Sequence, residues 1–369
     1  MKKTGIRLLI PVVLLCLLLP AAGAADGTVR ITGMASTSNS ITLEWENSGA
    51  SYYEVCRATS RNGAYLRIGT TRQPTYRDTG LRSGQVYFYR IRPCWESRSG
   101  TRYGAFSSPV GQCCVNVIHA PAMQNPCYQQ GKTIQVSGLM LHSVGCAQES
   151  GAVFASSWNQ PSADVLVHAV IEPGGNVYQL ADWNMRCWHC GGSGNDSLIG
   201  VEMTEPNELR YYSGTGFTWS GSAREKAIDN YNTAVALFAN LCFQYNLNPL
   251  TDICSHREGG ERGIASGHGD PEHLWNGLGL SLTMDTFRRD VQKKMQGTYQ
   301  NRTLQDTAGR TATVTADVLN VRGGPGTGYA VLTELYAGQT VAILETRWSD
   351  GQTWGRLASD GWICMAYVQ

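Results

Sequence analysis

The spacing of apolar residues changes twice along the chain, and this change most constrains the fold. In residues 28–117, apolar and polar residues alternate over short segments such as 41–45 and 86–91, with glycine-containing turns between them. A period of two is typical of half-buried β-strands, and strands at such regular spacing favour a small two-sheet sandwich. We therefore expect an all-β N-terminal domain with Trp45 and Tyr89 packed in its core.

Residues 129–298 mix strand-like and helical spacing. The predicted strands and helices lie at 165–171, 176–180, 198–203, about 222–247 and 284–296. Ser222 and Glu225 have the spacing of a capping box at the start of the long helix. Helices on a mixed sheet predict an α/β core that is large enough to hold an active site.

The segments on either side of this core have different residue patterns. Residues 118–128 contain Pro121 and Pro126 without periodicity, which indicates a linker. Residues 311–369 return to short strand-like segments and predict a small C-terminal β-barrel. The fold class is therefore multidomain: a β-sandwich, a central α/β domain with helices flanking a mixed sheet, and a small β-barrel.

The first 25 residues have the pattern of a secretory signal. Lys2, Lys3 and Arg7 precede an apolar run at 8–19, and small residues follow at 21–25. This arrangement predicts cleavage and a secreted mature protein. The run is short for a bilayer span and no later run is long enough, so we expect no membrane contact after cleavage.

Charge and cysteine content narrow the choice of partner and setting. The chain has 30 Lys+Arg against 29 Asp+Glu, so its charge gives no argument for binding to nucleic acid or to an anionic membrane. We also expect the protein to be a monomer. Among the 12 cysteines, Cys56 and Cys94 fall in two strand-like segments and are candidates for a disulfide, and a Cys187–Cys190 link would stiffen its loop.

Six of the seven histidines lie in the central region, between His142 and His273. Neutral imidazole is the commonest zinc ligand, and a catalytic zinc takes three protein ligands and keeps one position open. Spacing alone does not choose among the candidates, which are His142, His168, His189, Glu202, His256, His268, Asp270 and His273.

Five short motifs in this region occur in a fixed order. They are L-H-S at 141–143, the strand-turn-strand from 167 to 177, W-H-C-G at 188–191, I-G-V-E at 199–202, and S-H-R-E at 255–258 followed by G-H-G-D-P at 267–271. Together they make residues 138–285 resemble the zinc-dependent N-acetylmuramoyl-L-alanine amidases, a group that includes phage amidases and animal peptidoglycan recognition proteins. Cys190 departs from the small alanine usual at its position.

The resemblance implies a site residue by residue. His142, His256 and Asp270 would bind Zn²⁺, and Glu202 would be the general base. His268 stands where relatives carry lysine or another donor, so it would stabilise the oxyanion. His189 would line the substrate site beside Trp188, which is expected to contact substrate or to pack.

The remaining histidines and the flanking domains receive other interpretations. His168 would orient a core or neighbouring group, and His273 would compete with Asp270 as a ligand or lie on the surface. Residues 28–117 resemble a fibronectin type III domain. Residues 311–369 resemble a bacterial SH3-like domain through L-N-V-R-G-G-P at 319–325, which implies binding to the cell wall.

These observations predict a secreted hydrolase associated with the cell wall. Its partner would be bacterial peptidoglycan, and it would cut the amide bond between N-acetylmuramic acid and the L-alanine of the stem peptide. The alternative is a peptidoglycan-binding protein without catalysis, because animal relatives often lose the third zinc ligand. Here Asp270 and Glu202 are both present, which favours the enzyme.

Overall fold

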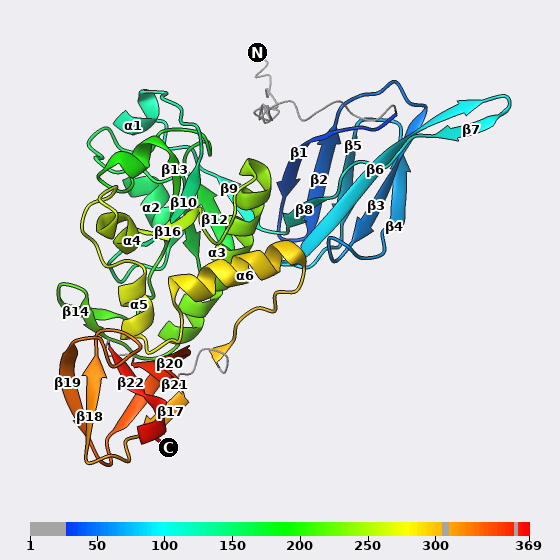
Figure 1. The fold of residues 1–369 in the computed structure, drawn as a ribbon. Helices are drawn as coiled ribbons and strands as arrows, with labels where there is room; N and C mark the ends of the chain where they lie inside the picture. The colour runs from blue at the N-terminus through cyan, green and yellow to red at the C-terminus, as the bar shows by residue number, and fades with distance from the viewer. Residues whose placement is uncertain (1–26, 305–309, 358–360) are drawn as a thin grey trace. The chain divides into compact units, whose positions relative to one another are not determined.

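The computed structural model describes residues 27–304, 310–357 and 361–369, so the predicted signal at 1–25 lies outside the described residues. The chain is multidomain and divides into two compact units, one ending at Cys114 and the other holding 115–369 together with 83–85. Figure 1 shows the helices and strands of both units.

The N-terminal unit consists of two antiparallel sheets. The three-stranded sheet contains β1 (Ile31–Ser36), β2 (Ser40–Trp45) and β5 (Thr75–Thr79), and the five-stranded sheet contains β3 (Tyr52–Ala58), β4 (Leu66–Thr71), β6 (Val86–Ser97), β7 (Gly100–Tyr103) and β8 (Val110–Cys113). Side chains from both sheets share one apolar core, which includes Trp45 and Tyr89 as expected. The Tyr89 hydroxyl donates a hydrogen bond to Asp78 Oδ2 at 2.8 Å, so its polar end is also satisfied.

The strand register excludes the predicted Cys56–Cys94 disulfide. Cys56 lies opposite Arg90, and Cys94 lies opposite Tyr52, four residues away along the same strand pair. Four residues of a strand span about 13 Å, well beyond the Cα separation that a disulfide allows. Cys187 and Cys190 are also free thiols, as is every cysteine in the described part of the chain.

A six-stranded mixed sheet forms the centre of the second unit. Its order is β16 (Ile253–Ser255), β10 (Gly138–Ser143), β13 (Leu198–Met203), β11 (Ala169–Glu172), β12 (Asn176–Gln179) and β9 (Asn116–His119). β16, β10, β13 and β11 are parallel neighbours, so their carboxyl ends meet at one edge. Ligands bind at this edge in open α/β sheets.

Helices pack against this sheet, as Figure 1 shows. α3 (Ala223–Tyr245) contacts β11 and β13, and α6 (Met284–Gln296) contacts α3 and β16. The shorter helices are α1 (Pro126–Gln129), α2 (Gly151–Ser157), α4 (His256–Glu261) and α5 (Glu272–Gly277). Buried aromatic side chains of α3, α5 and α6 contact one another edge to face, which fixes these helices.

Three local predictions are corrected by the structure. The segment expected to be a linker instead contributes to strand β9, which pairs with β12, and to helix α1. The capping box at Ser222 does not form, because its hydroxyl donates to Glu208 Oε1 at 3.1 Å. The strand expected from residue 165 begins only at Ala169.

The C-terminal residues form a second six-stranded sheet. Its order is β17 (Arg310–Thr313), β20 (Thr340–Ser349), β21 (Gln352–Leu357), β22 (Trp362–Cys364), β18 (Val318–Arg322) and β19 (Val331–Tyr336). Short alternating strands with their own apolar core match the predicted β-rich region. Among the described residues, no helix has both the length and the apolar composition that a membrane span requires.

Candidate metal centre

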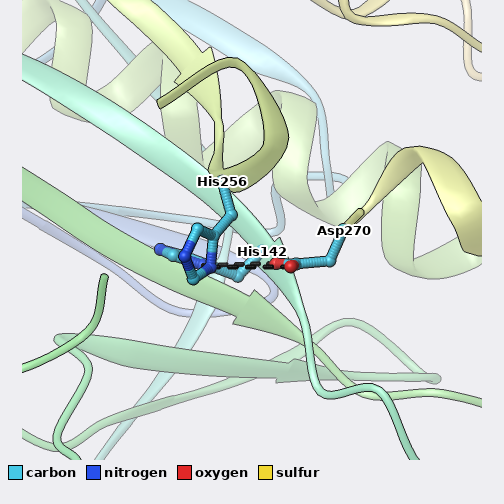
Figure 2. Close-up of side chains that lie close together, drawn as sticks. All are labelled: His142, His256 and Asp270. Atoms are coloured by element: carbon cyan, nitrogen blue, oxygen red, sulfur yellow. Dashed lines mark hydrogen bonds and ion pairs between the residues drawn. The ribbon is translucent and has the colours of Figure 1, made fainter. Parts of the chain in front are cut away.

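Three side chains that are far apart in sequence meet at the carboxyl edge of the central sheet. His142 is the second-to-last residue of strand β10, and His256 is the first residue after strand β16. The register places Leu141 opposite Ser255. The residues that follow them in sequence, His142 and His256, therefore lie at the same level of the sheet edge. Asp270 comes from the loop before α5 and completes the group (Figure 2).

The geometry of this group is one that could hold a metal ion. One ligand atom from each of His142, His256 and Asp270 lies within 4.8 Å of the others. The two Nδ1 atoms are 3.0 Å apart, and Asp270 Oδ2 and Oδ1 lie 3.3 and 3.5 Å from Nδ1 of His142 and His256, respectively. All three residues are buried.

A chain of hydrogen bonds fixes the proton on His142. His189 Nε2 lies 3.1 Å from Leu198 O, which can only accept, so this nitrogen carries the proton. Burial lowers the pKa of His189 well below its usual value, so the ring is neutral and its Nδ1 is an acceptor. It therefore accepts from His142 Nε2 at 3.0 Å, which leaves the His142 Nδ1 lone pair directed into the group.

The same reasoning applies to His256. Its Nε2 lies 3.1 Å from Ser266 Oγ, and this hydroxyl donates to Cys190 O at 3.2 Å. The serine oxygen therefore accepts from Nε2, which in the neutral tautomer of His256 leaves Nδ1 as the acceptor that faces the group. Two lone pairs that face each other beside a carboxylate repel, and a cation between them removes the repulsion, so the residues present fit a metal ion.

Gly200 makes room for the ring that orients His142. A Cβ added at Gly200 would lie 2.4 Å from His189 Cγ and Nδ1, far inside van der Waals contact. The glycine of the I-G-V-E motif therefore has a packing reason, since only a residue without a side chain lets the His189 ring lie over strand β13.

Glu202 stands beside the metal group but is not part of it. It is directly opposite His142 in the parallel register of β10 and β13. Its Oε2 is buried, with no hydrogen-bond partner in the described ranges. Burial, followed by the negative charges of Asp270 and Glu205, raises the pKa of Glu202 well above its usual value. A carboxylate with high proton affinity and a free oxygen is suited to act as a base.

The pKa of Asp270 moves in the other direction. Burial alone would raise it, but a proton or positive charge on the side of His142 and His256 that faces the carboxylate outweighs burial and lowers the pKa, and a metal cation held there would act in the same direction. Asp270 and Glu202 are therefore two neighbouring carboxyl groups with opposite proton affinities, an arrangement that separates the role of ligand from the role of base.

A buried carboxylate that the motifs did not single out connects the segments around the group. Glu205, fully buried, accepts from Ser143 Oγ at 2.8 Å and Gly145 N at 3.1 Å, and from the Tyr211 hydroxyl on the hairpin of β14 (Arg210–Ser213) and β15 (Gly216–Thr218). His273 Nε2 lies 3.3 Å from it. Glu205 thus connects the end of β10 to the hairpin and to α5. In the sequence, only its position three residues after Glu202 marks it.

The other predicted site residues lie in three different environments. His268 is exposed over 59% of its side chain and stacks on the His256 ring with centroids 4.3 Å apart. His189 is only 6% exposed and uses both ring nitrogens, so its position does not suit the predicted contact with substrate. Trp188 is half-buried and packs against an apolar cluster.

His168 and His273 are not part of the metal group. His168 is fully buried, donates from Nε2 to Met185 O and accepts from Gly200 N, and burial lowers its pKa to about 4. It therefore fixes strand β13 and its neighbours, in agreement with the predicted orienting role. His273 contacts Glu205 and Tyr211, so it neither competes with Asp270 for the group nor lies free on the surface.

Comparison with known proteins assigns two parts of the chain. Residues 132–273 match the family model of N-acetylmuramoyl-L-alanine amidase, and residues 317–369 match that of the bacterial SH3 domain. No curated protein matches the sequence.

Solved structures similar to the chain include a mutant endolysin from Bacillus subtilis, with 19% identity over 48% of this chain and 99% of that one and a TM-score of 0.34. The catalytic domain of XlyA has 21% identity over 47% and 98%, with a TM-score of 0.35. Staphylococcus aureus hydrolase AmiA in complex with its ligand has 15% identity over 52% and 89%, with a TM-score of 0.39.

The family matches cover the segment that carries the metal group and the C-terminal sheet. The chain therefore contains an N-acetylmuramoyl-L-alanine amidase domain at residues 132–273 and a bacterial SH3 domain at residues 317–369.

Proposed function

We propose that the protein is a zinc-dependent peptidoglycan amidase that hydrolyses the bond between N-acetylmuramic acid and the L-alanine of the stem peptide. The observation that carries the proposal is the convergence of His142, His256 and Asp270 beside the unpartnered oxygen of Glu202. Zn²⁺ held by these three residues would supply a Lewis acid that polarises the scissile carbonyl and acidifies a water molecule.

Glu202 would move the proton in this reaction. The water oxygen adds to the carbonyl carbon while Glu202 Oε2 takes the water proton, and the same oxygen then gives that proton to the leaving amine. The C–N bond breaks, which leaves a carboxylate on the lactyl group of the sugar and a free amino group on L-alanine. The unpartnered Oε2 of Glu202, beside the metal group, suits both the uptake and the return of the proton.

Three other residues would support this chemistry. His189 and Ser266 would keep the Nδ1 lone pairs of His142 and His256 directed toward the metal. His268, exposed beside His256, would donate to the developing oxyanion. A contact of Trp188 and His189 with substrate remains the sequence-based expectation, although the buried position of His189 favours an orienting role.

The flanking regions support the wall as the setting. We propose that residues 311–369 hold the enzyme on peptidoglycan, as the match to a bacterial SH3 domain suggests, and that the N-terminal sandwich is a fibronectin type III-like module. We also propose that the mature protein is a secreted monomer without a membrane contact.

Replacement of the base tests the function. Glu202→Gln keeps the shape of the side chain but removes the proton acceptor, so zinc content should stay at one ion per chain while peptide release from purified cell walls falls by about 10²- to 10⁴-fold. Elemental analysis and amino-group release measure the two quantities on the same preparation. Full release by the zinc-loaded variant would refute the assigned role.

A further inference from the structure

The near neutrality of the whole chain conceals a strong separation of charge. Residues 27–114 contain eleven arginines, no lysine and five acidic residues, a net charge of +6. Residues 115–369 contain 16 basic and 23 acidic residues, a net charge of −7. The charges cancel only when the two units are added together. The N-terminal unit alone is strongly basic and could attract an anionic partner.

Internal ion pairs neutralise only a minority of these arginines. Arg30 pairs with Glu46, Arg57 pairs with Asp78, and Glu54 accepts from both Arg67 and Arg92. Arginines without a carboxylate partner among the described residues are Arg61, Arg72, Arg77, Arg82, Arg90, Arg98 and Arg102. Glu54 and Asp78 are buried beside the arginines that they neutralise, so the positive charge of this unit comes mainly from these seven arginines.

One face of the five-stranded sheet gathers arginines and aromatic rings, and we call it the arginine–ring face. Its members are Arg67, Arg90, Arg92, Tyr65, Tyr103 and Phe106. The Arg90 guanidinium lies 4.7 Å from the centre of the Tyr65 ring, and that of Arg92 lies 4.5 and 4.7 Å from Tyr103 and Phe106. Ring contact holds the flat side of a guanidinium and leaves N–H groups at its edge for an acceptor in its plane.

The strand register spaces the three cations for a chain-like ligand. Arg90 and Arg92 are two residues apart on β6, about 7 Å along the strand. Arg67 and Arg90 lie opposite Cys56 from the two sides of β3, about 10 Å apart across the sheet. Glu54 lies between Arg67 and Arg92 and accepts from both, so the face carries three guanidinium groups and one carboxylate, a net charge of +2. The guanidinium of Arg90 and the remaining N–H groups of Arg67 and Arg92, at this spacing, match a flexible polymer with repeated single negative charges better than one small anion.

We propose that the arginine–ring face binds an anionic polymer of the cell wall in which phosphodiesters link polyol or sugar units. Guanidinium groups bind phosphate oxygens through two parallel hydrogen bonds, and the absence of lysine in this unit favours such forked contacts over point charges. The choice of a wall polymer rests on the proposed function, because the amidase domain would act where such polymers are attached.

Nucleic acid, the other flexible phosphodiester, suits this face less well. Proteins that bind single strands stack the bases on aromatic side chains. Here Tyr65, Tyr103 and Phe106 are already in contact with guanidinium groups. A polymer without bases needs only the charge and the hydrogen bonds that the arginines offer.

The experiment measures binding of the full chain to soluble poly(glycerol phosphate) over a range of salt concentrations. This polymer has no amide bond, so amidase activity does not enter, and a failure here is distinct from a failure of the proposed function. The probes for comparison are polygalacturonate, oligo(dT) and phosphatidylglycerol vesicles. We expect poly(glycerol phosphate) to bind most tightly, with the logarithm of the affinity falling linearly with the logarithm of salt.

The test variant is Arg67→Gln combined with Arg90→Gln, in which Arg92 still pairs with Glu54. Affinity should fall about tenfold at moderate salt, and the salt slope should fall by roughly one to two. The matched control, Arg72→Gln with Arg77→Gln, removes the same charge from exposed positions outside the face and should change affinity less than about twofold.

Three results would overturn the proposal. One is equal or tighter binding of any comparison probe by the wild-type chain, or no binding of poly(glycerol phosphate) at low salt. Another is an equal loss of affinity in the control pair. The third result concerns Arg90→Lys, the mildest of the changes. It keeps the positive charge but removes the two parallel N–H donors of the guanidinium group. It should weaken binding severalfold, and unchanged affinity would contradict the proposal even if the double variant did not fold.

Discussion

The two histidines of the metal group present the same nitrogen, Nδ1, because each ring has its other nitrogen engaged behind it. His189 accepts from His142, and Ser266 accepts from His256. Outer contacts of this kind set the tautomer and the orientation of a ligand. The protein thus directs two lone pairs and one carboxylate to one point.

The identity of the third ligand can be tested by removing Asp270. Asp270→Ala should weaken zinc affinity by more than about 100-fold, because loss of an outer contact alone costs 10- to 100-fold. His273→Ala should keep zinc, since His273 contacts Glu205 and Tyr211 instead. Competition with a fluorescent chelator measures both affinities. Retention of zinc by the first variant and loss by the second would reverse the assignment.

The contact between Gly200 and His189 gives a second test at this scale. Gly200→Ala places a methyl group where the imidazole lies, so the ring must move and His142 loses its acceptor. Zinc affinity should fall about 10- to 100-fold. In a His189→Ala background the same change should cost little more, because the two residues act through one contact. Additive losses would show that the glycine acts in another way.

Sequence motifs identified the residues of the metal group but not all of their roles. His142, His256 and Asp270 meet as the amidase resemblance implied. His189 was expected to face substrate, because one sequence does not show that Leu198 O lies behind its ring. Glu205 was missed for the same reason, since its partners come from three separate segments.

At the scale of elements, the parallel strands β10, β13 and β16 place the metal group and the base at one sheet edge. The helix at 284–296 and the strand at 198–203 appear where the sequence predicts them, because the helix repeats apolar residues every three or four positions and the strand is mostly apolar. β9 was not predicted, since four residues carry too little periodicity and its pairing partner, β12, is 60 residues away. Ser222 did not cap α3 because Glu208 offered its hydroxyl another acceptor.

Helix α5 contains a buried carboxyl that makes stability depend on pH. Glu272 accepts from Ser255 Oγ at 2.8 Å, and its Oε2 has no hydrogen-bond partner in the structure as described. Burial raises its pKa to about 7, so the folded protein holds this proton between about pH 4.5 and 7 while the unfolded chain releases it. Glu272 therefore lowers the free energy of unfolding as pH rises through that window.

Glu272→Gln removes this pH dependence while the Ser255 hydroxyl keeps an acceptor. At pH 8 the variant should be more stable than the wild type by about 2–3 kcal/mol, and at pH 4 the two should be nearly equal. Urea denaturation of the metal-free proteins at both pH values measures the difference. A variant that is destabilised equally at both values would show that the carboxyl makes a contact that glutamine cannot replace.

At the scale of the whole molecule, the chain joins an amidase domain to a bacterial SH3 domain and to a basic sandwich. Enzymes that act on insoluble polymers gain from additional binding modules, because attachment raises the local concentration of substrate. Catalysis and attachment should therefore be separable in this chain.

Removal of residues 311–369 tests this separation. The shortened chain should bind purified cell walls more weakly by about tenfold or more, since one of two linked contacts is lost. Its turnover of a short soluble muropeptide should stay within about twofold of the full chain, because the metal group belongs to residues 142–270. An equal loss of wall binding and of muropeptide turnover would show that the C-terminal sheet supports the fold of the amidase domain and does not serve attachment.

The identity of the bond that is cut tests the central claim most directly. Cell walls digested with the zinc-loaded protein can be analysed for new amino-terminal residues and new reducing sugar ends in the same sample. We predict new amino-terminal L-alanine in proportion to the glycan strands freed of peptide, no new reducing ends, and neither product with Glu202→Gln. New reducing ends, or new amino termini at any residue other than L-alanine, would contradict the assignment of this protein as an N-acetylmuramoyl-L-alanine amidase.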